Sequence, residues 1–341
     1  MINNDDSMDK ANWPTVFESN LLYLIVLVLM VVSSLVFGVQ DIADLNVREF
    51  YFRTFVLEVA VIGLPPLLYL LYKRADVSKV IRLNRIKVKE IFLVICMAVF
   101  GYGIIIFINY IWIWLISHIG EPIAQPSIPI GTGEHYLVAL ICIAVVPALV
   151  EEFMFRGVIL RGYERMGRKV GVIMSGILFA LLHMSLVNLP AIILLGIMIS
   201  YIVQLSDSII TGMIYHFTNN AIAVTLLYAS NNIYSSLEDI QPKVPENIDP
   251  ALVGDVTNMP VETFLSVIIG LGIIMLFSLA MFVLCFRAFK RSTQERTLKG
   301  REEIASTFYK ARPAEMVPAI IALVIIVIFL ALEVFAMIAI G

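Results

Sequence analysis

Long apolar runs recur along the whole chain, and they constrain its fold more than any other feature. The nine runs are Leu21–Val39, Thr54–Tyr72, Ile91–Ile116, Tyr136–Arg156, Val170–Leu189, Ala191–Leu205, Ile209–Leu227, Phe264–Phe286 and Val317–Ile340. A transmembrane helix needs about 20 apolar residues, whereas membrane β-strands alternate in polarity over segments of about 10 residues. The sequence therefore predicts an all-α, polytopic bundle of transmembrane helices with eight to nine spans.

The composition excludes several other classes of protein. The mean hydropathy is +0.91, and only 15% of the residues are charged. The net charge of −3 argues against a nucleic-acid partner. Cys96, Cys142 and Cys285 lie in apolar runs without CxxC spacing, which predicts buried free thiols and no thiolate metal site.

Lysine and arginine predict the orientation of the chain in the membrane. They number seven in residues 73–90, five in 156–169 and eight in 287–312. The alternate segments hold two in 40–53, none in 117–135 and one in 228–263. Cytoplasmic loops carry the excess of Lys and Arg, so we expect the N-terminus inside the cell and the C-terminus outside.

We divide the chain into four parts. Residues 1–135 hold a cytoplasmic tail and three spans, and 136–228 hold the polar motifs described below. Residues 229–262 form an extracytoplasmic loop, read as a connector or as a lid, and 263–341 hold the C-terminal spans. The sequence shows no internal or inverted repeat of the kind found in transporters.

A few ionisable residues lie inside the apolar runs. Such residues are costly in a bilayer and indicate a functional site by default. Glu151 and Glu152 are adjacent in one run, and His183 and His216 lie in two others. We therefore predict one site shared by three helices.

The remaining intramembrane candidates have simpler explanations. His118 and His135 flank the outer loop at span ends, where an imidazole meets water. Glu58 lies near an interface, and Glu333 is placed to hydrogen-bond to a neighbouring span. Neither acid has a motif around it, so we interpret both as structural.

Spacing within the helices adds detail to the site. Residues four apart share a helix face. This applies to His216 with Asn220, Phe179 with His183, and Glu152 with Arg156. Adjacent Glu151 and Glu152 point about 100° apart, so one can face the site while the other pairs with the arginine at the helix end.

These groups are suited to hydrolysis. Two imidazoles and a carboxylate can hold zinc with one position left for water, and a second carboxylate can act as general base. An asparagine amide can donate to the oxyanion of a tetrahedral intermediate. The sequence has no HExxH and no GxSxG, so the groups must come from separate helices, which Gly176, Gly196 and Gly212 would allow to pack closely.

Three motifs in this order resemble a known family. EEFMFR (Glu151–Arg156) matches EExxxR, FALLH (Phe179–His183) matches FxxxH, and HFTNN (His216–Asn220) matches HxxxN. These are motifs of the CAAX-protease and bacteriocin-processing family (CPBP, or Abi) of intramembrane proteases. The resemblance covers roughly residues 136–228. The best-known members have eight spans, so an additional terminal span is expected here.

The resemblance implies an intramembrane endopeptidase that cuts a membrane-associated protein or peptide from the cytoplasmic side. It suggests Glu151 as the main catalytic carboxylate, Glu152 as its partner and Asn220 as the oxyanion donor, supported by Arg156 and Phe179. His183 and His216 would be ligands of a metal or of a free water. We expect Zn²⁺ on Glu151, His183 and His216, because two histidines and an acid form a reasonable ligand set.

Two other functions stay open at this point. The Glu and His residues could form the proton relay of a coupled transporter. The chain could also be a non-catalytic bacteriocin-immunity protein that only binds a peptide. The length of 341 residues, without an attached regulatory domain, favours a bacterial plasma-membrane enzyme.

Overall fold

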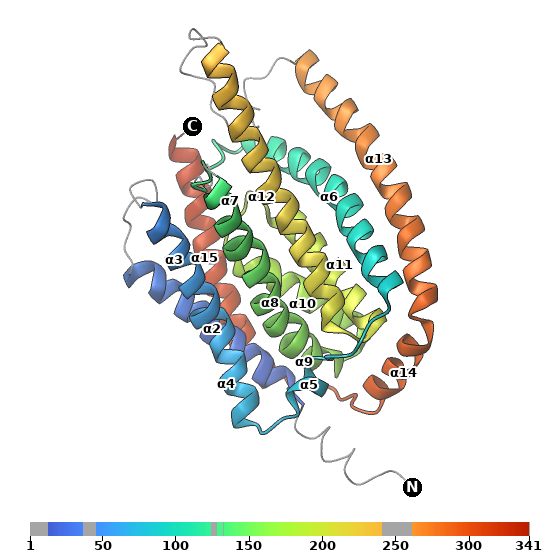
Figure 1. The fold of residues 1–341 in the computed structure, drawn as a ribbon. Helices are drawn as coiled ribbons and strands as arrows, with labels where there is room; N and C mark the ends of the chain where they lie inside the picture. The colour runs from blue at the N-terminus through green and yellow to red at the C-terminus, as the bar shows by residue number, and fades with distance from the viewer. Residues whose placement is uncertain (1–12, 37–45, 124–127, 132, 241–260, 341) are drawn as a thin grey trace.

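A computed structural model describes residues 13–36, 46–123, 128–131, 133–240 and 261–340. All regular elements within these ranges are helices, which confirms the all-α prediction (Figure 1). Cys96, Cys142 and Cys285 are free thiols, as expected, but only Cys142 is buried, and the other two are half-buried.

The helices follow the apolar runs of the sequence. In chain order they are α2 (Val16–Val36), α3 (Val47–Val56), η2 (Leu57–Gly63), α4 (Leu64–Tyr72), α5 (Val77–Val80), α6 (Val88–Ser117), α7 (Gly133–Ala139), η3 (Leu140–Val145), α8 (Val146–Glu152), η4 (Phe153–Ile159), α9 (Leu160–Glu164), α10 (Arg168–Leu182), α11 (Leu189–Ser206), α12 (Ile209–Ile240), α13 (Val261–Ser292), α14 (Gln294–Ala305), η5 (Pro313–Met316) and α15 (Val317–Ile340). The segments η2, η3 and η4 are π-helical turns inside longer continuous helices.

Seven of the described helices are long and apolar enough to cross a membrane, so the chain is a multi-pass membrane protein. They are Val16–Val36, Val47–Tyr72, Val88–Ser117, Gly133–Glu164, Leu189–Ser206, Val261–Ser292 and Pro313–Ile340. Each of the nine predicted runs overlaps a helix, but the count of about nine spans is not confirmed. The helix α10 has only 15 residues, and α12 carries polar His216, Asn219 and Asn220 in its first half.

Two helices run further than the sequence indicated. The helix that carries the glutamate pair does not end at Arg156 but continues to Glu164. The helix α12 extends to Ile240, so the first part of the predicted loop 229–262 is helical. Most of the rest of that loop, 241–260, lies outside the described residues.

The helices with the polar motifs occupy the middle of the bundle (Figure 1). There α8, α10, α11 and α12 lie side by side, and α10 packs along α11. On one side α2 packs against α15, and on the other α6 packs against α13. The helix α2 begins at one end of the bundle, and α15 ends at the opposite end.

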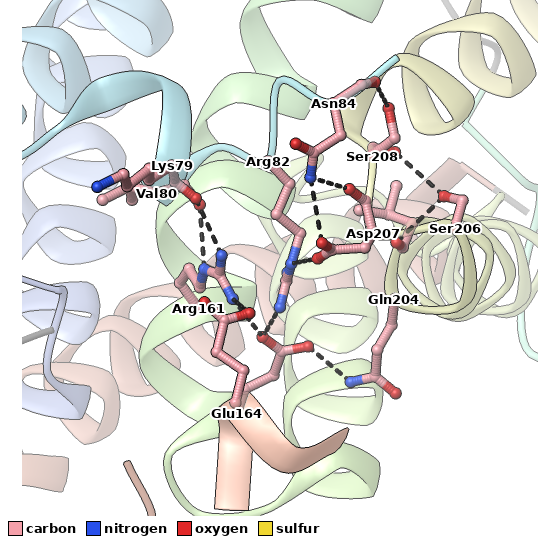
Figure 2. A network of polar contacts seen from close by, with 12 residues as sticks. Lys79, Val80, Arg82, Asn84, Arg161, Glu164, Gln204, Ser206, Asp207 and Ser208 are labelled. Carbon is pink, nitrogen blue, oxygen red and sulfur yellow. Dashed lines mark hydrogen bonds and ion pairs between the residues drawn. The ribbon is translucent and has the colours of Figure 1, made fainter. Parts of the chain in front are cut away.

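Polar contacts join the basic stretches 73–90 and 156–169 to the turn between α11 and α12 (Figure 2). Buried Arg82 pairs with Glu164, at the end of α9, and its Nε lies 2.9 Å from Asp207 Oδ1. Burial lowers the pKa of the Arg82 guanidinium, but Glu164 and Asp207 outweigh it and hold this pKa above its usual value. In the same region, the Nη1 of Arg296 donates to the carbonyl of Arg85. The gathering of basic residues at one end agrees with the predicted sidedness, and the assignment of that end to the cytoplasm stays a prediction.

This network also fixes the turn between α11 and α12. Arg82 and Asp207 both have positive φ angles, 57° and 52°, a conformation that costs energy for residues other than glycine. Asn84 donates from Nδ2 to Asp207 Oδ2 at 3.1 Å, and the backbone N–H of Ile209 donates to the carbonyl of Arg82 at 3.1 Å. The two strained turns are thus held by contacts with each other.

Replacing Glu164 with glutamine tests this network. Glu164→Gln keeps the shape of the side chain but removes a buried charge that faces Arg82, and breaking such a pair costs about 3 kcal/mol or more. We expect a clearly lower thermal unfolding midpoint for the full chain in detergent. Glu302→Gln, at an exposed position on α14, is the control and should leave the midpoint unchanged. Equal midpoints for both variants would contradict a stabilising role of the network.

Candidate active site

Both glutamates of α8 face the imidazole of His216. The Nδ1 of His216 lies 2.9 Å from Glu152 Oε1, and its Nε2 lies 3.9 Å from Glu151 Oε2. The sequence suggested that the two acids need not share a cavity. The structure brings them together because the imidazole presents a different nitrogen to each.

Arg156 is the counter-charge of Glu152, as the four-residue spacing predicted. The Arg156 side chain is fully buried, and its Nη1 lies 2.6 Å from Glu152 Oε1. Its Nη2 donates to the carbonyl of Gly196 on α11 at 3.1 Å. Arg156 therefore lies in the protein interior, eight residues before the helix ends at Glu164, and does not mark a membrane surface.

Phe179 on α10 packs between the polar groups. Its ring centroid lies 5.6 Å from that of His216 and 5.1 Å from that of His183. The guanidinium of Arg156 lies over the same ring, 4.5 Å from the centroid. A cation above an aromatic face is attracted by the ring quadrupole, so Phe179 fixes both the arginine and the imidazoles.

Glycines allow the helices to approach this closely. A Cβ at position 212 would lie 2.6 Å from Glu152 Oε2, so only glycine fits there without a shift. A Cβ on Gly196 would lie 2.7 Å from the carbonyl of Gly176. The three glycines singled out in the sequence therefore lie at close helix contacts, as predicted.

Asn220 is held by an irregularity in the facing helix. Pro147 has no N–H, so the carbonyl of Ile143 lacks the donor that an α-helix would provide four residues later. The Nδ2 of Asn220 donates to this carbonyl at 3.0 Å. One amide hydrogen is thus committed to the backbone, and the other is available to a substrate oxygen.

His183 lies just beyond the C-terminal end of α10, with an exposed side chain. Its Nδ1 is 2.9 Å from the carbonyl of Phe179, which leaves Nε2 free. The loop that follows is fixed by a hydrogen bond from the backbone N–H of Leu186 to Glu333 Oε2, at 2.7 Å. Glu333 therefore bonds to a neighbouring segment, as expected.

The residues expected to hold zinc are only partly together. Glu151 and His216 face each other, and the buried Oε2 of Glu151 has no hydrogen-bond partner among the described residues. No group of three His, Cys, Asp or Glu side chains in the described ranges is placed to hold a metal ion. Glu151 and His216 thus suit two zinc ligands, whereas His183 does not lie with them.

Glu58, which the sequence led us to interpret as structural, lies on a helix that packs against α8. This residue, on η2, interacts electrostatically with Glu151, and its Oε2 is buried without a partner in the part of the chain described. The helices are close here, because a Cβ on Gly63 would lie 3.0 Å from Val150 Cγ1. The signal in the sequence was an acid inside an apolar run, but nothing there indicated which helix it would face.

One comparison with known proteins bears on this site. Residues 133–222 match the family model of the Rce1-like type II CAAX prenyl endopeptidases. The matched region contains the three motifs and confirms the resemblance to the CAAX-protease family over that part of the chain. No curated protein and no solved structure matches the chain.

The close approach of Gly212, on α12, to Glu152 predicts that adding a methyl group at position 212 destabilises the site. Gly212→Ala would press on Glu152 Oε2, so we expect separation of Glu152 from His216 and a lower thermal unfolding midpoint in detergent. Gly270→Ala on α13 is the matched control, because a Cβ there meets no atom within 4 Å. It should leave the midpoint unchanged or raise it slightly, since alanine favours helix. A Gly212→Ala protein as stable as the control would show that the helices can relax apart.

Proposed function

We propose that the chain is an intramembrane endopeptidase that hydrolyses a peptide bond of a membrane-associated protein or peptide. One observation carries this proposal: Glu152 faces Nδ1 of His216, and Glu151 faces Nε2 of the same imidazole. The match of residues 133–222 to an endopeptidase family supports it. Glu151, Glu152 and Phe179 contact His216 inside an apolar bundle, and Asn220 follows one turn after His216 on α12.

The contacts of His216 define how water would be activated. Glu152, with Arg156 as counter-charge, is an acceptor, so we assign the imidazole hydrogen to Nδ1. His216 Nε2 then carries a lone pair and faces Glu151 Oε2 across 3.9 Å. A water molecule held by these two acceptors donates a hydrogen to each and directs an oxygen lone pair at the substrate carbonyl.

The reaction then follows in two steps. The water oxygen forms a bond to the carbonyl carbon while Glu151 takes the proton as general base. The second amide hydrogen of Asn220 stabilises the oxyanion, a contribution of about 3 kcal/mol in other hydrolases. The C–N bond breaks as Glu151 returns the proton to the leaving amine. Glu152 and Arg156 hold the imidazole in the tautomer that this step requires.

Zinc stays a prediction of the sequence. When bound, the ion would supply a Lewis acid that lowers the pKa of its water to about 7. Glu151 and His216 would be two of its ligands, the imidazole through the Nε2 that faces Glu151. The steps above do not depend on it.

Substituting Glu151 tests the proposed general base. Glu151→Gln should lower kcat by about 10²- to 10⁴-fold, the usual contribution of such a group. Cleavage would be followed by mass spectrometry with a peptide library that includes prenylated and unprenylated CAAX peptides. Glu134→Gln, on an exposed residue of the same transmembrane helix, should keep full activity. Proton or solute flux into liposomes without any cleavage would favour the transporter, and peptide binding without cleavage the immunity protein.

Metal analysis of the purified protein tests the zinc prediction. We expect one zinc per chain in the unmodified protein and none in His216→Ala, because that variant lacks an expected ligand. His118→Ala, on a residue after the end of α6, should keep the metal. Metal-free protein that still cleaves peptides would remove zinc from the mechanism and leave the Glu151–His216 pair as the activating groups.

A further inference from the structure

A pocket lined with cations lies where α13 meets α14. Its volume is about 370 Å³, and its walls include Arg287, Lys290, Arg291 and Arg301 together with Thr297 and Leu298. It lies outside residues 133–222, so the family match says nothing about it. None of the groups proposed for catalysis lines it.

The spacing of these residues builds the pocket from two helix faces. Arg287, Lys290 and Arg291 stand at positions i, i+3 and i+4 of the last turns of α13. On α14, Thr297 and Arg301 are four residues apart and share a face. The buried hydroxyl of Thr297 donates to the carbonyl of Leu205 at 2.8 Å, which fixes α14 against α11.

The cations of the pocket lack ion-pair partners among the described residues. No ion pair joins any of its four cations to an acid in the described part of the chain. Two acids of this region have other partners: Glu90 binds Arg296, and Glu303 lies 3.9 Å from Arg161 Nη1.

A fifth cation adds to this excess. Burial lowers the pKa of the Arg168 guanidinium, Glu164 opposes that effect, and nearby Arg301 lowers the pKa further. The Nη1 of Arg168 is buried with no hydrogen-bond partner among the described residues, and it would lie 3.8 Å from a Cβ on Gly300. Within the described ranges, Arg168 therefore adds to the cations without a hydrogen-bonded acid between α10 and α14.

The position of the pocket indicates the source of that anion. The helix α13 is a candidate span, and only 6% of its most apolar window is buried, so the face turned away from α6 is available to lipid. The cations stand at its C-terminal end, where the other basic stretches also gather (Figure 1). A phospholipid lying along α13 places its headgroup at this level, and basic pockets at the cytoplasmic surface bind such headgroups.

We propose that this pocket binds the phosphate of an anionic phospholipid headgroup. The guanidinium groups of Arg287, Arg291 and Arg301 can each offer two parallel N–H donors to phosphate oxygens, and Lys290 adds a point charge. Exposed Leu298 faces the apolar part of the lipid. The bound lipid would hold α14 on the membrane surface through the chain's own cations.

Lipid retention by the full chain tests this proposal. Native mass spectrometry in detergent would count the lipids kept after addition of phosphatidylglycerol or phosphatidylcholine. Arg291→Gln with Arg301→Gln removes two pocket charges. Lys299→Gln with Lys310→Gln removes two exposed charges of the same region that do not line the pocket. The control pair therefore measures the general attraction between cations and anionic lipid.

We expect the unmodified protein to retain one phosphatidylglycerol per chain. The pocket variant should bind this lipid at least tenfold more weakly. The affinity of the control variant should stay within twofold of that of the unmodified protein. Equal weakening in both variants would overturn the proposal, because it would show nonspecific attraction. Equal retention of phosphatidylcholine would overturn it too. Displacement of the lipid by millimolar inorganic phosphate would show a site for free phosphate and exclude a lipid-specific one. Unchanged unfolding midpoints would show that both variants are folded.

Discussion

The ion pair between Glu152 and Arg156 is the constraint on which the rest of the site depends. Both side chains are fully buried in an apolar bundle. An isolated charge in such surroundings costs several kcal/mol, so each needs its partner and further polar contacts. The arginine finds them in the carbonyl of Gly196 and the face of Phe179, and the carboxylate finds them in His216. One ion pair thus links four helices and sets the orientation of the imidazole.

The close packing around this pair requires small residues and an irregular backbone. A single methyl group on Gly212 would meet Glu152, and one on Gly196 would meet Gly176. The helix of the glutamate pair has π-helical turns both before and after α8, and Pro147 frees a carbonyl that Asn220 then binds. Departures of this kind cost stability, and π-turns inside α-helices are frequent at functional sites.

Hydropathy and spacing were sufficient to predict the all-helical membrane fold and the set of helices that meet at the site. The pairs Glu152–Arg156 and Phe179–His183 followed from the four-residue repeat of a helix, because that repeat depends only on local geometry. The burial of Arg156 could not be predicted. An arginine near the end of an apolar run looks the same in the sequence whether its side chain meets water or a buried acid. The approach of both glutamates to one imidazole depends on how α12 is placed against α8, which no local pattern contains. The helical residues 229–240 were assigned to a loop because they are polar, although α12 continues through them.

Two acids interpreted as structural connect the site to helices outside residues 133–222. Glu58 on η2 interacts with Glu151, and Glu333 on α15 binds the backbone of Leu186, three residues after His183. His183 is the expected zinc ligand that does not lie with Glu151 and His216. A movement of the whole loop after His183 would break the Leu186–Glu333 hydrogen bond or carry α15 with it. The flanking helices are therefore not passive membrane anchors, because α15 holds the loop that follows the second motif, FxxxH.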